Sequence, residues 1–213
     1  MKPNLKDMRL FIWDFDGTLM DTYPVTYAAY LQLALQDLGY TVPQAEIIGK
    51  MLVNVGHAID YYAALYRLPQ LRNRYEHYHA QGPVAAPKAY PQVEEVLARI
   101  RALGGVNCIF THRDNSIYPM LEHGGLRQEF AEIVIPQDPP FAAKPAPDTV
   151  LYLMERHGGT PETTVMVGDR VCDLGSGRNA GCHTLHLLTP AAPEYPECDW
   201  RIENYAQMLD MLK

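Results

Sequence analysis

The sequence lacks several features that mark whole classes of protein. Nowhere do about 18 apolar residues follow one another, the length that a membrane-spanning helix needs. It contains neither a GxGxxG nor a P-loop motif, so no dinucleotide or nucleotide cofactor is indicated. The opening residues, MKPNLKDMRL, have no apolar stretch of the kind found in secretory signals. We therefore expect a soluble protein of the cytoplasm.

Positive charge and cysteine are both scarce. The sequence has 18 Lys and Arg against 25 Asp and Glu, a formal net charge of −7, which disfavours general affinity for nucleic acid or an anionic membrane. Its four cysteines form no CxxC pair and no zinc-ligand spacing, so free thiols in a reducing compartment are expected. We therefore expect no nucleic-acid or membrane partner. The sequence indicates no particular oligomeric state.

What the chain does have is a regular alternation of short apolar strands and longer helices. Its 213 residues are 47% hydrophobic, enough for one globular domain that carries a smaller insert. Strands are predicted over 10–13, 106–110, 132–135, 164–167 and 183–187, and helices over 92–103, 116–123, 148–157, 172–180 and 206–212. This order predicts the α/β class, with a Rossmann-like parallel sheet covered by helices on both faces.

A helical segment interrupts this alternation after the first strand. Apolar and aromatic residues at three- and four-residue spacing predict helices over 23–38, 45–51, 56–65 and 68–79, with no strand between them. The Pro- and Ala-rich stretch 82–91 predicts a linker that returns to the sheet. We therefore predict an α-helical cap at residues 18–88, inserted into an α/β core formed by residues 1–17 and 89–213.

Two carboxylates follow the first strand. Phe11, Ile12 and Trp13 are typical of a strand buried on both faces, and Asp14 and Asp16 come directly after it. In an extended chain residues i and i+2 point to the same side, so both carboxylates could face one small volume. Their repulsion would be costly without a cation, and Mg²⁺ prefers such oxygen ligands. Taken alone, this segment is equally typical of a turn.

Further polar residues follow the later strands. Thr111 and His112 come after the second strand, Asp169 comes after the fourth, and Lys144 lies downstream of the third. Each of them has an ordinary explanation as a helix cap, a turn or a solvated side chain. Ligands bind outside the carboxyl ends of parallel strands, so their joint placement predicts one site shared with the acids of the first strand. This set of side chains fits magnesium-assisted phosphate chemistry.

Four of these segments resemble the motifs of the haloacid dehalogenase superfamily, in their order and approximate spacing. They are DFDGT at 14–18, Thr111 after a strand, Lys144 before a proline, and GDRVCD at 168–173. The helical segment between the first two motifs is similar to the small α-helical cap of that superfamily, so the resemblance covers essentially the whole chain. RNAG at 178–181 also resembles the branch that contains phosphoglycolate phosphatase and β-phosphoglucomutase.

The resemblance implies a phosphatase that acts on a small phosphorylated metabolite through an aspartyl-phosphate. Asp14 would be the nucleophile, and Asp16 would protonate the leaving oxygen and then activate water. Mg²⁺ would be held by Asp14, the backbone carbonyl of Asp16, and Asp169. Asp173 would support Lys144 or the metal shell.

The expected substrate contacts come from the core and from the cap. Thr111 and Lys144 would bind the phosphoryl oxygens. His112 and Arg113 follow Thr111 directly and are placed to meet an anion of the substrate. His112 is also expected to bind the phosphate. The tyrosines that crowd the cap are more typical of a small helical core than of a binding platform. The candidate substrate contacts in the cap are Lys50, Asn54 and His57.

Several reactions other than phosphate ester hydrolysis are also known from this superfamily. Dehalogenation needs no acid at position 16, so Asp16 favours phosphate ester cleavage. Phosphonate cleavage in relatives uses a cap lysine, but an exposed helix position accounts better for Lys50. Transfer of a phosphoryl group on a sugar phosphate, as in β-phosphoglucomutase, requires the same core. THRD at 111–114 differs from the small-hydroxyl pattern associated with the mutases, which weakens that alternative.

Two readings from other protein classes also remain. A response-regulator receiver gathers Asp, Thr and Lys around Mg²⁺, but its acceptor Asp lies on a middle strand and it has no helical insert. A haloacid dehalogenase-like protein could also bind a phosphorylated ligand without turnover. The complete set of motifs argues against this reading, and hydrolysis of a generic aryl phosphate with Mg²⁺ would distinguish the two.

Overall fold

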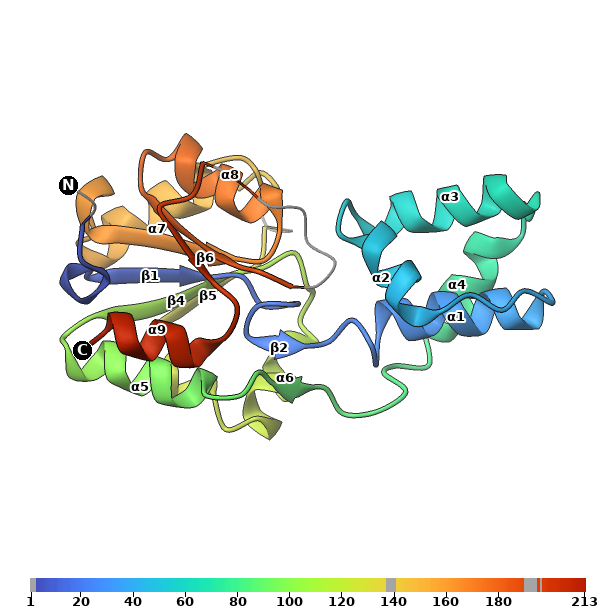
Figure 1. Cartoon of the computed structure of the whole chain (residues 1–213), viewed down its shortest axis with the longest axis horizontal. Helices are drawn as coiled ribbons and strands as arrows, with labels where there is room; N and C mark the ends of the chain where they lie inside the picture. The colour runs from blue at the N-terminus through green and yellow to red at the C-terminus, as the bar shows by residue number, and fades with distance from the viewer. Residues whose placement is uncertain (1–2, 137–140, 190–194, 196) are drawn as a thin grey trace. The chain divides into compact units, whose positions relative to one another are not determined.

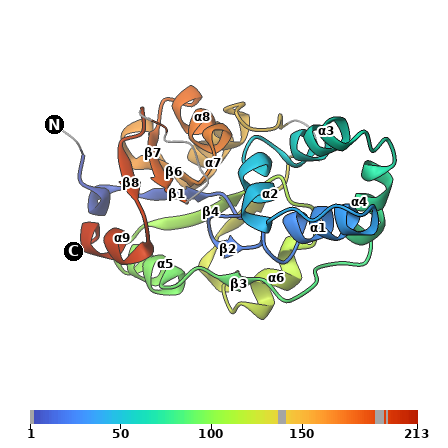
Figure 2. The same ribbon diagram turned by 45° about the vertical axis from the view of Figure 1, so that its right-hand side comes forward.

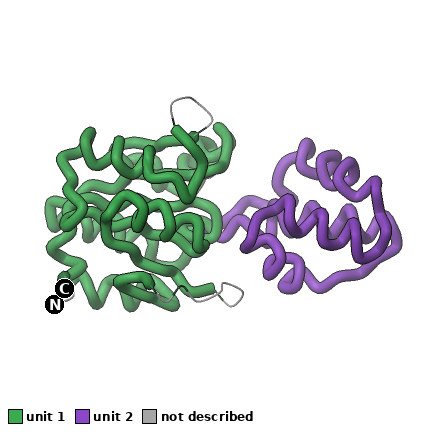
Figure 3. The backbone as a smooth tube through the Cα atoms, turned by 90° about the horizontal axis from the view of Figure 1, so that it is seen from above, with its two compact units in different colours: residues 1–20, 89–189, 193–213 green, residues 21–88, 190–192 purple. Residues whose placement is uncertain are grey.

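The chain forms two compact units in the computed structural model, which describes residues 3–136, 141–189, 195 and 197–213. Of these, unit 2 comprises residues 21–88 and unit 1 the remainder (Figure 3). Two short strands, β2 (Met20–Asp21) and β3 (Lys88–Ala89), pair with each other where the chain crosses from one unit to the other. Unit 2 is therefore an insertion into unit 1 with two adjacent connections.

Unit 1 is built on a parallel sheet of six strands in the order β5–β4–β1–β6–β7–β8 (Figure 1). Their bounds are β1 Leu10–Trp13, β4 Val106–Phe110, β5 Glu132–Val134, β6 Thr164–Gly168, β7 His183–Leu187 and β8 Trp200–Ile202. The register pairs Trp13 at the end of β1 with Ile109 of β4 and Val167 of β6. Residues that follow these three central strands are therefore brought to one edge of the sheet, where parallel sheets bind ligands.

Helices cover both faces of this sheet because β1 is apolar on both sides. Phe11 and Trp13 pack into one core with α5 (Val93–Ala102), α6 (Ile117–His123) and α9 (Tyr205–Met211). Leu10 and Ile12 pack into a second core, to which α7 (Asp148–His157) contributes, and α8 (Val171–Asn179) lies on the same side (Figure 1). Short 3₁₀ turns span Leu5–Asp7, Arg127–Glu129 and Pro161–Thr163. This arrangement confirms the predicted α/β fold.

Unit 2 is helical and has its own hydrophobic core. Its helices are α1 (Tyr27–Asp37), α2 (Gln44–Met51), α3 (Val55–Tyr66) and α4 (Leu71–His79). In this unit α1 lies beside α4 and α2 beside α3 (Figure 2). Tyr30, Tyr62 and Tyr75 are buried in the core with aliphatic side chains from all four helices. The prediction that tyrosines of the cap fill a small helical core is therefore confirmed for these three.

The structure differs from the sequence prediction mainly in short elements. Three strands were not predicted, β2, β3 and β8. β2 and β3 have only two residues each, and β8 lacks a run of apolar residues because Arg201 separates Trp200 from Ile202. α1 begins at Tyr27 rather than at residue 23, since residues 23–26 form turns. α4 begins at Leu71 rather than at residue 68, so Pro69 precedes the helix.

Two expectations about the whole chain can be compared with the described residues. All four cysteines are free thiols, as predicted. No helix in the described ranges has both the length and the apolar character that crossing a bilayer requires.

Candidate active site

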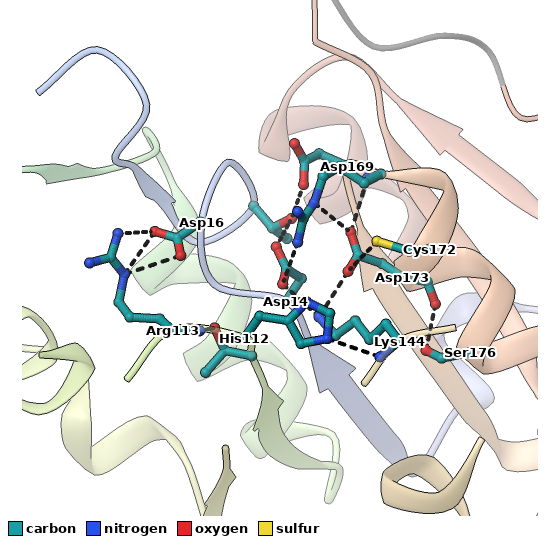
Figure 4. A network of polar contacts seen from close by, with 12 residues as sticks. Asp14, Asp16, His112, Arg113, Lys144, Asp169, Cys172, Asp173 and Ser176 are labelled. Carbon is teal, nitrogen blue, oxygen red and sulfur yellow. Dashed lines mark hydrogen bonds and ion pairs between the residues drawn. The ribbon is translucent and has the colours of Figure 1, made fainter. Parts of the chain in front are cut away.

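Three buried carboxylates meet at the carboxyl ends of the central strands (Figure 4). Asp14 follows β1, Asp169 follows β6, and Asp173 lies in the first turn of α8. One oxygen atom from each lies within 4.8 Å of the others, and none of the three residues is more than 1% exposed. Three acidic groups are therefore concentrated in one buried volume, where repulsion between their charged forms is strong.

Lys144 lies among these acids and holds two of them. Its Nζ donates to Oδ1 of Asp14 at 2.6 Å and to Oδ1 of Asp173 at 2.8 Å, and its side chain is fully buried. Burial lowers the pKa of Lys144, but the charges of Asp14 and Asp173 outweigh it, so that the pKa is raised above its ordinary value. The lysine is therefore a cation. The structure brings it to the predicted site, in contact with the predicted partner Asp173.

Thr18 and Arg170 complete this cluster, and sequence reasoning assigned neither a role. The Thr18 hydroxyl lies 3.3 Å from Oδ2 of Asp14 and 3.2 Å from Oδ1 of Asp169. The Arg170 guanidinium approaches Oδ1 of Asp14 to 3.9 Å through Nη2, and its backbone N–H donates to Oδ2 of Asp173 at 3.0 Å. Both residues belong to the motifs quoted from the sequence: Thr18 directly follows Gly17, and Arg170 directly follows Asp169. Those positions could have indicated that they belong to the site.

Negative charge exceeds positive charge in the cluster. Burial, and then the charge of Asp173, raise the pKa of Asp14 to about 6, although Lys144 and Arg170 oppose the shift. Burial and the charge of Asp14 likewise raise the pKa of Asp169 well above its ordinary value. Among the described residues, Oδ2 of Asp169 has no hydrogen-bond partner although it is buried. A buried acceptor in a carboxylate cluster fits a divalent cation with oxygen ligands.

Asp16 points away from this cluster, contrary to the expectation that its carboxylate and that of Asp14 face one volume (Figure 4). Its carboxylate accepts three hydrogen bonds from Arg113, at 2.6, 2.9 and 3.1 Å. The rule for extended chains does not apply here because β1 ends at Trp13, before either acid, and a turn begins at Gly17. Gly17, with φ of 80°, allows the turn. Asp16 is thus beside the site with its side chain engaged by Arg113.

Thr111 and His112 lie at the predicted strand end, in different roles. The buried hydroxyl of Thr111 accepts the backbone N–H of Arg113 at 3.1 Å. Nε2 of His112 accepts the backbone N–H of Lys144 at 2.9 Å. Burial and the nearby charges of Lys144 and Arg170 lower the pKa of His112 to about 4, so its ring is neutral near pH 7. The ring of His112 therefore positions the segment that carries Lys144 and adds no positive charge.

The cap candidates Lys50, Asn54 and His57 all lie in unit 2. The Asn54 side chain accepts the backbone N–H of His57 at 2.7 Å and caps α3. Nζ of Lys50 lies 4.1 Å from the centre of the Tyr61 ring, a cation–π contact. Local structural roles within unit 2 thus account for Asn54 and Lys50.

Gly168 at the end of β6 makes room for Asp173, and we expect Gly168→Ala to disturb the site. A Cβ built on Gly168 would overlap the Cβ of Asp173. We expect a loss of about 1–3 kcal/mol in unfolding free energy, as for overpacked cores. Gly49→Ala in α2 is the control, since its added Cβ would have no atom within 4 Å apart from those of its chain neighbours and the nearby backbone of the helix; it should stabilise by about 0.5–1 kcal/mol. Urea denaturation measures both, and equal effects would contradict this account.

The chain resembles known proteins over most of its length. Residues 11–187 match the family model described as haloacid dehalogenase-like hydrolase. A phosphoglycolate phosphatase from Aliivibrio fischeri is 29% identical over 194 residues, which cover 85% of each chain. The pyrophosphatase PpaX from Oceanobacillus iheyensis is 30% identical over 180 residues, which cover 83% of this chain and 82% of that protein.

Solved structures share the fold. A crystal structure of a predicted phosphoglycolate phosphatase from Haemophilus somnus has a TM-score of 0.78 to this chain at 22% identity, covering 97% of this chain and 99% of that one.

The segment that matches the family model, residues 11–187, contains all four carboxylates and the lysine of the described site. The chain therefore belongs to the haloacid dehalogenase-like hydrolase family, as an enzyme of its phosphatase branch.

Proposed function

We propose that this protein is a magnesium-dependent phosphatase that hydrolyses a small phosphorylated metabolite through an aspartyl-phosphate on Asp14. The observation that carries the proposal is the cluster of Asp14, Asp169 and Asp173, buried around Lys144 at the end of the central strand. This cluster has an excess of negative charge and a buried Asp169 oxygen without a hydrogen-bond partner among the described residues. An anionic nucleophile in such a place needs a further cation before it can meet a phosphate.

The ligands proposed for Mg²⁺ are Asp14, Asp169 and the backbone carbonyl of Asp16. When bound there, the ion would offset charge on the phosphoryl group and on the acids around it. Asp173 is a less suitable ligand because its oxygens accept from Lys144 at 2.8 Å and from the Arg170 backbone at 3.0 Å. We assign Asp173 the role of holding Lys144 in place.

In the proposed reaction, a carboxylate oxygen of Asp14 attacks phosphorus and the bond from phosphorus to the leaving oxygen breaks. Asp16, which must first leave Arg113 and take up a proton from solvent, gives that proton to the leaving oxygen. Asp16 then takes a proton from water, which attacks the aspartyl-phosphate, releases inorganic phosphate and restores Asp14. Thr111 and Lys144 would bind phosphoryl oxygens. His112 would contribute by positioning the segment of Lys144, since its Nε2 accepts the backbone N–H of that residue at 2.9 Å.

The names of the relatives indicate which substrates to test first. One is called a phosphoglycolate phosphatase and another a pyrophosphatase. We propose a small phosphate ester as the substrate and the cytoplasm as the location, which suits four free thiols.

A substrate panel tests the proposed function. Purified protein with Mg²⁺ is assayed against 2-phosphoglycolate, pyrophosphate, sugar phosphates, nucleotides and p-nitrophenyl phosphate, with both free phosphate and isomerised product measured. Release of phosphate supports the phosphatase. Isomerised sugar phosphate without free phosphate would select a mutase instead. No turnover of any compound, in protein shown to bind Mg²⁺, would select a protein that only binds phosphorylated ligands.

We expect Mg²⁺ to stabilise the folded protein, because binding to the folded state alone shifts the unfolding equilibrium. At a concentration of about 100 times Kd the gain is about 2.7 kcal/mol. Thermal denaturation with and without Mg²⁺ measures it. The gain should be lost in Asp169→Asn and kept in Asp7→Asn, since Asp7 is an exposed residue of the first 3₁₀ turn. Equal gains in the two variants would show that the ion does not bind at Asp169.

A further inference from the structure

A tyrosine of the last helix contacts the turn that follows β1. Tyr205 is the first residue of α9, and its hydroxyl donates to the backbone carbonyl of Thr18 at 2.8 Å. Only 1% of this tyrosine is exposed. Burial of the phenol, with further contributions from Tyr90 and the nearby acids, raises its pKa well above the ordinary value, so the hydroxyl keeps its proton and donates. Tyr205 lies outside residues 11–187, the segment that matches the family model.

Helix α9 is fixed at both ends, so the Tyr205 hydroxyl is held in a defined place. The Asn204 side chain caps its start by accepting a backbone N–H of the first turn at 3.2 Å. At the other end, Arg99 of α5 donates to the carbonyl of Leu212 at 3.0 and 3.2 Å, and α9 lies beside α5 (Figure 1). The Tyr205 ring packs in the core, with its centre 6.2 Å from that of the Trp13 ring. The contact with the turn therefore comes from a rigid part of the core.

Thr18 connects this contact to the proposed metal ligands. Its hydroxyl lies 3.3 Å from Oδ2 of Asp14 and 3.2 Å from Oδ1 of Asp169. Gly17, which directly precedes Thr18, has φ of 80° and no side chain that restricts its backbone. The position of the Thr18 hydroxyl between the two acids therefore depends on what holds the backbone of that residue. The hydrogen bond from Tyr205 to the Thr18 carbonyl is such a support.

We propose that Tyr205 is a positioning residue for the metal site: it fixes the Thr18 carbonyl and thereby holds the Thr18 hydroxyl against both Asp14 and Asp169. Side chains that bond metal ligands orient them, and losing such a partner typically lowers metal affinity about 10–100-fold. Tyr205 acts one contact further from the ion, so we expect an effect at the lower end of that range. The inference rests on the proposed magnesium site.

Binding of Mg²⁺ in the absence of substrate tests this role. Kd is measured by isothermal titration calorimetry, and stability by urea denaturation. Tyr205→Phe removes the hydroxyl and keeps the ring, and we expect Kd to rise about tenfold. Tyr62→Phe is the matched control, because Tyr62 is also buried and donates to Glu46 at 3.1 Å within unit 2. The control should lose stability but keep the wild-type Kd.

A double substitution separates positioning from stability. Thr18→Val keeps the shape of the side chain but removes its hydroxyl, and should itself raise Kd about tenfold or more. If Tyr205 acts through that hydroxyl, adding Tyr205→Phe to Thr18→Val should change Kd by less than about twofold. The urea midpoint should still fall, because the Thr18 carbonyl loses its donor in either background. A purely structural tyrosine would lower the urea midpoint in both backgrounds and change Kd in neither.

The outcomes separate this inference from the proposed function. An unchanged Kd in Tyr205→Phe, with wild type binding Mg²⁺, would refute the role of Tyr205 and leave the phosphatase standing. An equal rise in Tyr62→Phe would also refute it, since any loss of stability would then weaken binding. A wild-type protein that does not bind Mg²⁺ would refute the proposed metal site, and the inference with it.

Further variants keep the test decisive if one of these proteins fails to fold. If Thr18→Val does not fold or does not bind the ion, the Kd values of Tyr205→Phe and Tyr62→Phe decide. If Tyr205→Phe does not fold, Asn204→Ala decides, because it removes the exposed cap that fixes the start of α9. It should raise Kd in the same direction, and a wild-type Kd in that variant would refute the role of Tyr205.

Discussion

Replacing Asp14 by Asn is expected to lower kcat by about 10⁴-fold or more while the protein remains folded. The amide cannot act as the nucleophile that forms the aspartyl-phosphate. The fold should survive because two effects oppose each other. Lys144 loses one of its two anionic partners, while Asp169 and Asp173 lose a buried negative neighbour. We expect the unfolding free energy to change by no more than about 1–2 kcal/mol.

Steady-state hydrolysis of p-nitrophenyl phosphate and urea denaturation measure the two parts of this prediction. Asp7→Asn serves as the matched control, because it makes the same change at an exposed position. Activity of Asp14→Asn within a factor of about 10 of wild type would refute the assignment of the nucleophile. Loss of the fold would instead show that Asp14 is needed for structure, and phosphorylation of the wild-type residue, detected by mass spectrometry, would then test its role.

The sheet could be predicted from sequence because its strands are strongly apolar. β1, β4, β6 and β7 each have four or five residues and are largely buried, so their composition alone marks them. In β8 an exposed Arg201 separates Trp200 from Ile202, so this strand lacks the run of apolar residues, Ile133 to Ile135, that marked the equally short β5. The carboxyl-end rule then predicted a shared site for Asp14 and Asp169, residues that are 155 positions apart in sequence.

Side-chain directions could not be predicted in the same way. Asp16 was expected beside Asp14, but its carboxylate turns to Arg113 because the extended chain ends at Trp13. Arg113 was expected to meet the substrate, but its guanidinium binds Asp16. These two residues are 97 positions apart, so their contact could not be predicted from local sequence. Arg170 received no role because an arginine in a helix-start motif is ordinarily solvated, whereas here its side chain is 14% exposed and faces the acids.

Removing the charge of Lys144 is expected to cause the largest loss of stability of any single change in the site. Its ammonium is fully buried and bonds Asp14 at 2.6 Å and Asp173 at 2.8 Å. Lys144→Met keeps a similar length of side chain but leaves both carboxylates without this cation. Breaking one side of a buried ion pair costs about 3–5 kcal/mol. Urea denaturation without Mg²⁺ measures the loss, and kcat should fall with it.

A second substitution separates lost charge from lost packing. If unpaired carboxylates cause the instability, then adding Asp173→Asn to Lys144→Met should recover part of it, since one buried charge is removed. In the wild-type background Asp173→Asn should instead destabilise the protein, because the folded state favours the charged form of Asp173. Burial raises the pKa of Asp173, but the charges of Lys144 and Arg170 outweigh burial and lower the pKa overall. A change of sign between the two backgrounds is the signature of direct coupling. Lys6→Met, at an exposed position, should alter stability by less than about 0.5 kcal/mol. Additive effects of the two site substitutions would mean that packing, and not charge, is what Lys144 supplies.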